Sequence, residues 1–119
     1  MSAELRLNKL KLRLPPTPKP MGTYKTIVIT NNMAYVSGHG PLLPDGTLLV
    51  GRVGSEVDQQ AGYQAAYQTG LAILATLRAN LGSLDRINRV IKILGMVNCT
   101  EDFYQQPKVI NGCSELFSK

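Results

Sequence analysis

The sequence of 119 residues has little of what metal chemistry and membrane insertion require. It contains one histidine, His39, so it has neither a histidine pair nor an HExxH pattern. No apolar run reaches the roughly 18 residues that a membrane-spanning helix needs. We therefore expect no metal site, no cofactor and no membrane as a partner.

Cysteine is also scarce. Cys99 and Cys113 lie fourteen positions apart, without Cys-x-x-Cys spacing and without histidines nearby. This pattern favours two reduced thiols over a disulfide or a zinc site. Reduced thiols are typical of a cytoplasmic protein, which is the compartment we expect.

Basic charge is concentrated at one end of the chain. Residues 1–25 hold six of the 13 lysines and arginines and one acid, whereas residues 26–119 hold seven of each sign. A neutral body disfavours nucleic acid as a partner. Leu7, Leu10 and Leu14 fall at helical spacing among the cations, which predicts a short basic helix. It could be a solvated flap, an anion-binding patch or a targeting signal, and we favour the flap.

The chain is long enough for one domain with its own core. We divide it into residues 1–20, a basic helix and a Pro-rich connector, and residues 21–119, an α+β domain. Alternating and β-branched residues predict strands at 24–30, 33–37, 47–53 and 87–97, the first two pairing as a hairpin. Apolar spacing predicts a long helix, capped by Ser55 and closed by Gly82, and a second helix capped by Thr100.

This order, β-β-β-α-β-α, predicts an α+β fold with one mixed sheet and two helices packed on one face. Small residues in the first half of the long helix favour close packing on the sheet. In the second helix, either Ile110, Cys113 and Phe117 or Val109 and Leu116 face inward. Pro107 requires a place in that helix's first turn.

Candidate functional residues each have a structural alternative. Tyr24 is either a ring packed at a strand edge or a phenol in a cleft. His39 is either a hydrogen-bonding residue in a glycine-rich turn or a proton carrier. Ser37 suits a strand end better than a nucleophile, since no base is placed for it. Asn111 either faces solvent or bonds across an interface.

Six segments, taken together and in order, resemble the YjgF/RidA family, in the branch labelled endoribonuclease L-PSP. They begin at Leu14-Pro-Pro and continue with Tyr35-Val-Ser-Gly-His-Gly-Pro41, Gly51-x-Val-Gly54, Gly62-Tyr-Gln-Ala-Ala66, Leu81-Gly-Ser-Leu-Asp-Arg-Ile87 and Val109-Ile-Asn-Gly-Cys-Ser-Glu115. The resemblance implies a chorismate mutase-like fold and a homotrimer with clefts between subunits. It also implies hydrolysis of reactive 2-imino or 2-enamine acids to 2-keto acids and ammonia.

Residue by residue, the resemblance assigns Tyr24, Ser37, Gly38, His39 and Asn111 to substrate binding, with an imino or keto acid as the small-molecule partner. It assigns no catalytic residue. In the family, an arginine-bearing segment and a closing strand follow the second helix, and we expect both to be missing here. We therefore expect impaired deaminase activity from these 119 residues. The alternatives are a non-catalytic trimer that binds small metabolites, and a ribonuclease or translation inhibitor.

Overall fold

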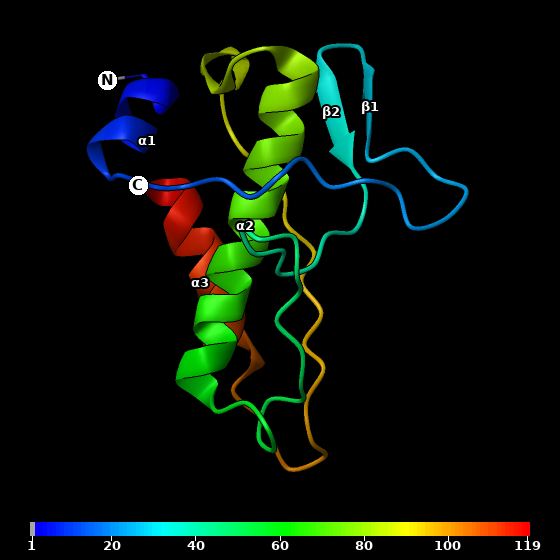
Figure 1. Cartoon of the computed structure of the whole chain (residues 1–119), viewed down its shortest axis with the longest axis vertical. Coiled ribbons are helices and arrows are strands. Elements are labelled where there is room, and N and C mark those ends of the chain that lie inside the picture. The colour runs from blue at the N-terminus through cyan, green and yellow to red at the C-terminus, as the bar shows by residue number, and fades with distance from the viewer. Residues whose placement is uncertain (1) are drawn as a thin grey trace.

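The structure is a computed structural model that describes residues 2–119. Three α-helices, one 3₁₀ helix and a two-stranded antiparallel sheet form an α+β fold, as predicted (Figure 1). In chain order these are α1 (Ala3–Lys9), β1 (Ile27–Thr30), β2 (Met33–Val36), α2 (Gln59–Leu81), η1 (Leu84–Arg86) and α3 (Gln106–Ser118). None of these helices is long and apolar enough to cross a membrane.

The predicted hairpin is confirmed, with strands shorter than expected. β1 and β2 pair from Ile27 opposite Val36 to Thr30 opposite Met33. Asn31 and Asn32 form the turn with φ values of 49° and 62°. Two positive φ values match the twist of a two-residue hairpin, and asparagine adopts them more readily than most residues.

The long helix α2 begins later than predicted. Its N-cap is Asp58, whose carboxylate accepts a hydrogen bond from the Ala61 N–H at 2.8 Å. The expected cap, Ser55, lies in a preceding turn and donates its N–H to the Arg52 carbonyl. Both residue types are good caps, so the fold of the approaching chain decides between them. Gly82 closes the helix at φ 85°, as predicted.

The second long helix, α3, also starts downstream of its predicted cap. The Thr100 hydroxyl donates to the Asp102 carboxylate, and the Thr100 carbonyl accepts the Phe103 N–H. Thr100 therefore forms a turn and does not cap the helix. The helix begins at Gln106, and Pro107 lies in its first turn, as the sequence requires. Its buried face comprises Val109, Gly112, Cys113 and Leu116.

Small residues let α2 and α3 pack very closely. A β-carbon at Gly112 would overlap the carbonyl oxygen of Tyr63 on α2. Gly70 on α2 leaves room for Leu116 and Cys113. The small residues of α2 therefore serve mainly a helix–helix contact, whereas the sequence favoured contact with a sheet.

Two segments predicted as strands, 47–53 and 87–97, form no regular strand. The first makes isolated bridges only, from Leu48 to Leu42 and from Val53 to Val57 and to Cys99, the last of which lies just after the second segment. Val53 is also at the centre of the core, packed with Ala66, Val109 and Cys113. The chain from Leu42 to Leu49 folds back on itself instead of joining a larger sheet. The prediction of regular strands here is wrong because a strand requires a continuous ladder of hydrogen bonds to a neighbour, and these segments have isolated bridges or none.

The N-terminal helix is anchored, so the favoured interpretation as a solvated flap is wrong. Glu4 forms an ion pair with Arg78 of α2 at 3.1 Å and accepts the Leu84 N–H at 2.8 Å. Asp85 in turn accepts the Glu4 N–H at 2.9 Å. Leu7 is buried. An acid in a basic leader thus fixes it to η1 and α2.

Candidate functional site

Four of the five predicted site residues lie near the open end of the hairpin. Ser37 follows β2 and donates its N–H to the Thr26 carbonyl at 2.9 Å. Its hydroxyl donates to the carbonyl of Lys25, which is the residue after Tyr24. The hydrogen bonds of Ser37 therefore continue the hairpin beyond the last strand pair, to Thr26 and Lys25. They hold the residue after β2 against the residues that precede β1.

Gly38 presents open backbone at this position. A β-carbon built there would have no neighbour within 4 Å, and the residue is exposed. An uncrowded backbone at a strand end can be approached closely by a ligand or by another chain. The geometry is compatible with the binding role that the resemblance assigns to Gly38.

His39 connects the loop to α2 by both ring nitrogens. Nδ1 lies 2.7 Å from the Ser37 carbonyl oxygen, and Nε2 lies 2.7 Å from the Thr76 hydroxyl. A carbonyl oxygen can only accept, so Nδ1 carries a hydrogen. In the neutral ring Nε2 then accepts from Thr76. His39 is thus a hydrogen-bonding residue of the turn in this structure, and its tautomer is set by the backbone.

Tyr24 lies at the start of the same region, with its ring partly exposed. Its hydroxyl oxygen accepts the Met21 N–H at 3.0 Å, and Gly22 lies close to the ring. The phenol can still donate its own hydrogen, which makes it a free donor beside the hairpin end. Tyr24 and Ser37 are therefore close through Lys25, although thirteen positions separate them.

Asn111 lies apart from this group within the chain. It is an exposed residue of α3, next to Gly112, and no described hydrogen bond joins it to Tyr24 or to residues 37–39. Its predicted place in the same pocket, within one subunit or between neighbouring subunits, stays a prediction.

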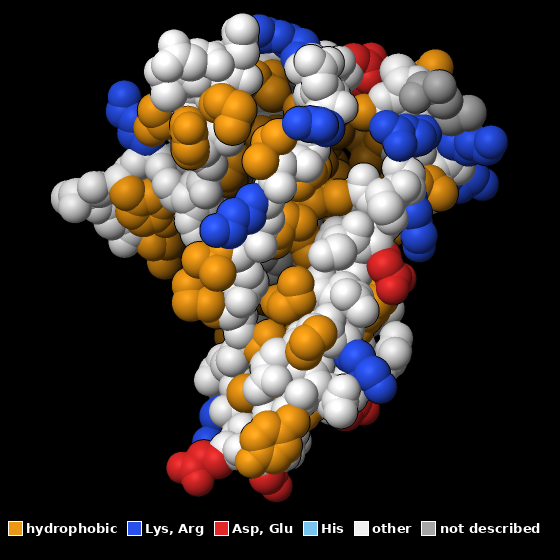
Figure 2. All heavy atoms as spheres, turned by 180° about the vertical axis from the view of Figure 1, so that it is seen from behind, with side chains coloured by type: hydrophobic (Ala, Val, Ile, Leu, Met, Phe, Trp, Pro, Cys, Tyr) orange, Lys and Arg blue, Asp and Glu red, His pale blue; other side chains and the backbone are white. Residues whose placement is uncertain are grey.

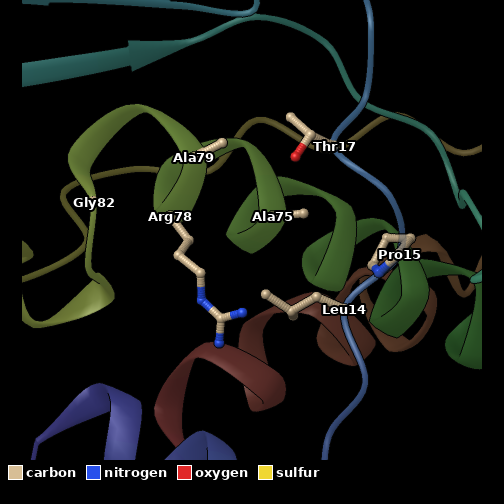
Figure 3. A pocket seen from close by; sticks show the side chains of 7 residues that line it. All are labelled: Leu14, Pro15, Thr17, Ala75, Arg78, Ala79 and Gly82. Atoms are coloured by element: carbon tan, nitrogen blue, oxygen red, sulfur yellow. The ribbon is translucent and has the colours of Figure 1, made fainter.

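The sequence did not single out Thr76 or Arg78. Thr76 is fully buried on α2 and holds His39, and the only sequence signal for it is a hydroxyl on an otherwise apolar helix face. Arg78 borders a cavity of about 310 Å³ between α2 and the Pro-rich connector (Figure 3). Its side chain points from α2 toward α1, where Glu4 neutralises its charge.

Two ionisable groups outside this region, Tyr63 and Cys113, have raised pKa values with structural causes. The Tyr63 hydroxyl donates to the Glu115 carboxylate, which together with desolvation raises the pKa of Tyr63. Burial raises the pKa of the Cys113 thiol. Among residues 2–119 no cluster of three or more His, Cys, Asp or Glu side chains has the geometry of a metal site.

Comparison with known proteins places this geometry in a family. A family model described as "YjgF/chorismate mutase-like, putative endoribonuclease" matches residues 4–119. Protein TCP17 of Trypanosoma cruzi is 33% identical over 110 residues, covering 92% of this chain and 69% of its own length.

Two solved structures are also similar. One is described as a "putative endoribonuclease" from Shewanella oneidensis, with a TM-score of 0.92 and 30% identity over 98% of this chain and 77% of its own. A protein of unknown function from Agrobacterium tumefaciens has a TM-score of 0.83 and 39% identity over 95% of this chain and 70% of its own. The chain belongs to the YjgF/chorismate mutase-like family.

Proposed function

We propose that this protein is a hydrolytic deaminase of reactive 2-imino and 2-enamine acids. The observation that carries the proposal is the grouping of Tyr24, Ser37, Gly38 and His39 at one hairpin end, in a chain of this family. Each matches a binding position of the RidA-like pattern that the sequence resembles. The group offers donors and exposed backbone without a covalent nucleophile.

The reaction requires no more than positioning and polarisation. Water adds to the electrophilic carbon of the C=N bond, the C–N bond then breaks, and ammonia leaves with a 2-keto acid as the other product. In the proposed reaction the Gly38 N–H and the free Tyr24 hydroxyl donate to a substrate carboxylate or carbonyl oxygen. Fixed donors stabilise charge as it develops in the tetrahedral adduct.

A trimer would complete the site. The outer face of the hairpin carries Val28 and Tyr35 as a cross-strand pair, both exposed by more than half. Exposed apolar pairs on a sheet favour burial against another chain. In the proposed homotrimer, Asn111 of one subunit faces Tyr24 of its neighbour. Light scattering that gives the mass of a stable monomer at micromolar concentration would argue against this arrangement.

Activity is tested by following keto acid and ammonia release from enzymatically generated 2-iminopropionate, above the spontaneous rate. Two proteins are compared: the 119-residue chain, and a chimaera that appends the part of the Shewanella relative without a counterpart here. We expect a low rate from the first and a rate at least tenfold higher from the second. A cationic clamp of the kind the family uses contributes about 1.5–3 kcal/mol per hydrogen bond.

The matched variants are Tyr24→Phe, which removes only the donor hydroxyl, and Tyr104→Phe, at an exposed position far along the chain. Tyr24→Phe should lower kcat/KM of the chimaera about tenfold, the loss of one hydrogen bond to the transition state. Tyr104→Phe should leave it unchanged. If neither protein exceeds the spontaneous rate, the proposal is wrong.

Ribonuclease activity is the second candidate, because the family description and the Shewanella relative both name it. Exposed Lys9, Lys11 and Arg13 of the leader would supply phosphate contacts. RNA cleavage by the same preparation, lost on replacing these three cations and weakened by salt, would favour this function over imine hydrolysis. Saturable binding of a keto acid without turnover would instead favour a non-catalytic binding protein.

A further inference from the structure

The cavity of about 310 Å³ between the Pro-rich connector and the C-terminal half of α2 lies within a single chain (Figure 3). Its walls come from residues 14–17 on one side and residues 75–82 on the other, and none of them belongs to the hairpin end. Its volume is at the lower end of the range for small-molecule sites. Pro15 is buried, and the prolines of the connector fix the backbone of this wall. The cavity is therefore formed before any ligand arrives, which lowers the cost of binding.

Arg78 supplies the charge of this cavity. It is the one charged residue among the described residues that line it. Nη2 of its guanidinium lies 3.1 Å from Oε1 of Glu4, and the side chain makes no other hydrogen bond within residues 2–119. The remaining N–H groups are open, and the side chain is 41% exposed. A guanidinium presents planar pairs of donors, which fit the two oxygens of a carboxylate.

Glu4 occupies only part of this guanidinium. Its second oxygen, Oε2, accepts the Leu84 N–H at 2.8 Å, so a single oxygen makes the contact with Arg78. The ion pair therefore balances the charge of Arg78 but leaves a two-donor edge without a partner. A dianion such as phosphate suits the site less well, because Glu4 repels it and no second cation lines the cavity. One carboxylate group fits both the donors and the charge.

The wall beyond the guanidinium is mainly apolar. In Figure 3 the side chains of Leu14 and Ala75 lie between the Arg78 guanidinium and Thr17. An alkyl chain can cover these walls, and each methylene that it buries favours binding. A cation at one end of an apolar cavity suits an acid with a short hydrocarbon chain.

The charge of the surroundings also favours an anion. Figure 2 shows Lys and Arg side chains gathered at the end of the molecule that carries α1, with few acidic side chains among them. The sequence has the same bias, since residues 1–25 hold six basic residues and one acid. A surface field of one sign raises the local concentration of small ions of the other sign.

We propose that this cavity binds a short-chain monocarboxylate. The carboxylate accepts two hydrogen bonds from the free edge of the Arg78 guanidinium, and the alkyl chain lies against Leu14 and Ala75. Glu4 keeps its hydrogen bond to Leu84, and its negative charge opposes that of the ligand. The site is distinct from the proposed catalytic site and is complete within one chain.

Titration of the 119-residue protein with acetate, propionate, butyrate and pentanoate tests the proposal. The readouts are the NMR signals of the Ala79 and Gly82 amides and of Nε–Hε of Arg78. We expect the affinity to rise with chain length, by up to about fourfold for each methylene that the cavity buries. An affinity independent of chain length, or no binding, would overturn the proposal. Shifts confined to Gly38 and His39 would overturn it too, because they place the acid at the hairpin end.

Two variants change the cavity and leave the hairpin end intact. Arg78→Lys keeps the charge but loses the two-donor edge, and we expect it to weaken pentanoate binding about tenfold. Ala79→Leu fills the cavity and should weaken binding by a similar factor. Ala61→Leu, at an exposed position in the first turn of the same helix, is the matched control and should bind as the parent does. Circular dichroism checks that each variant is folded. Parental affinity in both Arg78→Lys and Ala79→Leu would show that the acid binds elsewhere.

Glu4→Gln should have the opposite effect. Glutamine keeps an oxygen that can accept the Leu84 N–H, but it removes the negative charge beside the bound acid. We expect pentanoate to bind this variant about threefold more tightly, or better. Salt should narrow the difference between variant and parent, since it screens the repulsion. Equal or weaker binding by Glu4→Gln would contradict the placement of the carboxylate on Arg78.

Discussion

The Nε2 atom of His39 lies 2.7 Å from the Oγ1 atom of Thr76, a side chain with no solvent exposure. This hydrogen bond joins the loop after β2 to the middle of α2. Through this bond, a side chain of α2 connects the candidate site to the helical layer. Gly38 lies one residue before His39 in this loop.

We predict that Thr76→Val destabilises the protein by about 1–3 kcal/mol, because valine has the same shape but leaves Nε2 of His39 without its partner. Urea unfolding followed by circular dichroism measures the change. The control is Thr69→Val on the same helix, whose hydroxyl donates only to the Ala65 carbonyl one turn earlier. Equal losses from both variants would show that the link to His39 contributes nothing specific.

Gly112→Ala should be among the most damaging single substitutions. The added β-carbon would overlap the Tyr63 carbonyl, which is backbone and cannot rotate away, so α2 and α3 must separate. Overpacking of this kind costs about 1–3 kcal/mol or more, although alanine is otherwise the better helix former. Thermal unfolding measures it, with Gly38→Ala as the tolerated control. A Gly112→Ala protein as stable as the parent would mean that the helices are not in this close contact.

Glu4→Ala should release the leader from the body. The variant loses both the ion pair with Arg78 and the acceptor for the Leu84 N–H. Because the pair is partly exposed, we expect a global destabilisation of only about 1 kcal/mol, but much faster tryptic cleavage after Lys11 and Arg13. Glu101→Ala, an exposed acid, is the control. Unchanged cleavage kinetics would contradict the anchoring role of Glu4.

The two thiols should differ in reactivity with pH. Burial raises the pKa of Cys113, so its thiolate fraction at a given pH is below that of an ordinary cysteine, and buried position further limits access. A raised pKa also means that Cys113 favours folding below the unfolded thiol's pKa and loses that contribution as pH rises through its own. We expect Ellman's reagent to react mainly with Cys99 at pH 8. Comparing Cys99→Ser with Cys113→Ser identifies each thiol, and a rapidly reacting Cys113 would contradict its burial.

Local features were predictable from sequence where the chain itself determines them. Asn31 and Asn32 carry the turn geometry in their own residue type, so the hairpin and with it the closeness of Tyr24 to Ser37 follow from adjacent residues. Pro107 likewise fixes its own place in a first helical turn. These predictions needed no information from distant parts of the chain.

Features set by distant partners were not predictable. Asp58 caps α2 instead of Ser55 because residues 52–57 form a turn. The distant Cys99 holds this turn through its bridge to Val53. The predicted strand at 87–97 does not form, because no local pattern could indicate that its backbone would lack a partner. Thr76 was missed because a buried hydroxyl has meaning only once His39 is beside it. That Asn111 joins the site stays a prediction.

The anchoring of α1 has a consequence for synthesis on the ribosome. Glu4 leaves the exit tunnel before its partners Arg78, Leu84 and Asp85, which follow about eighty residues later. A seven-residue helix is too short to be stable alone in water. The leader therefore docks only after its partners have been made, and until then its leucines and cations are open to any factor that binds a basic apolar chain.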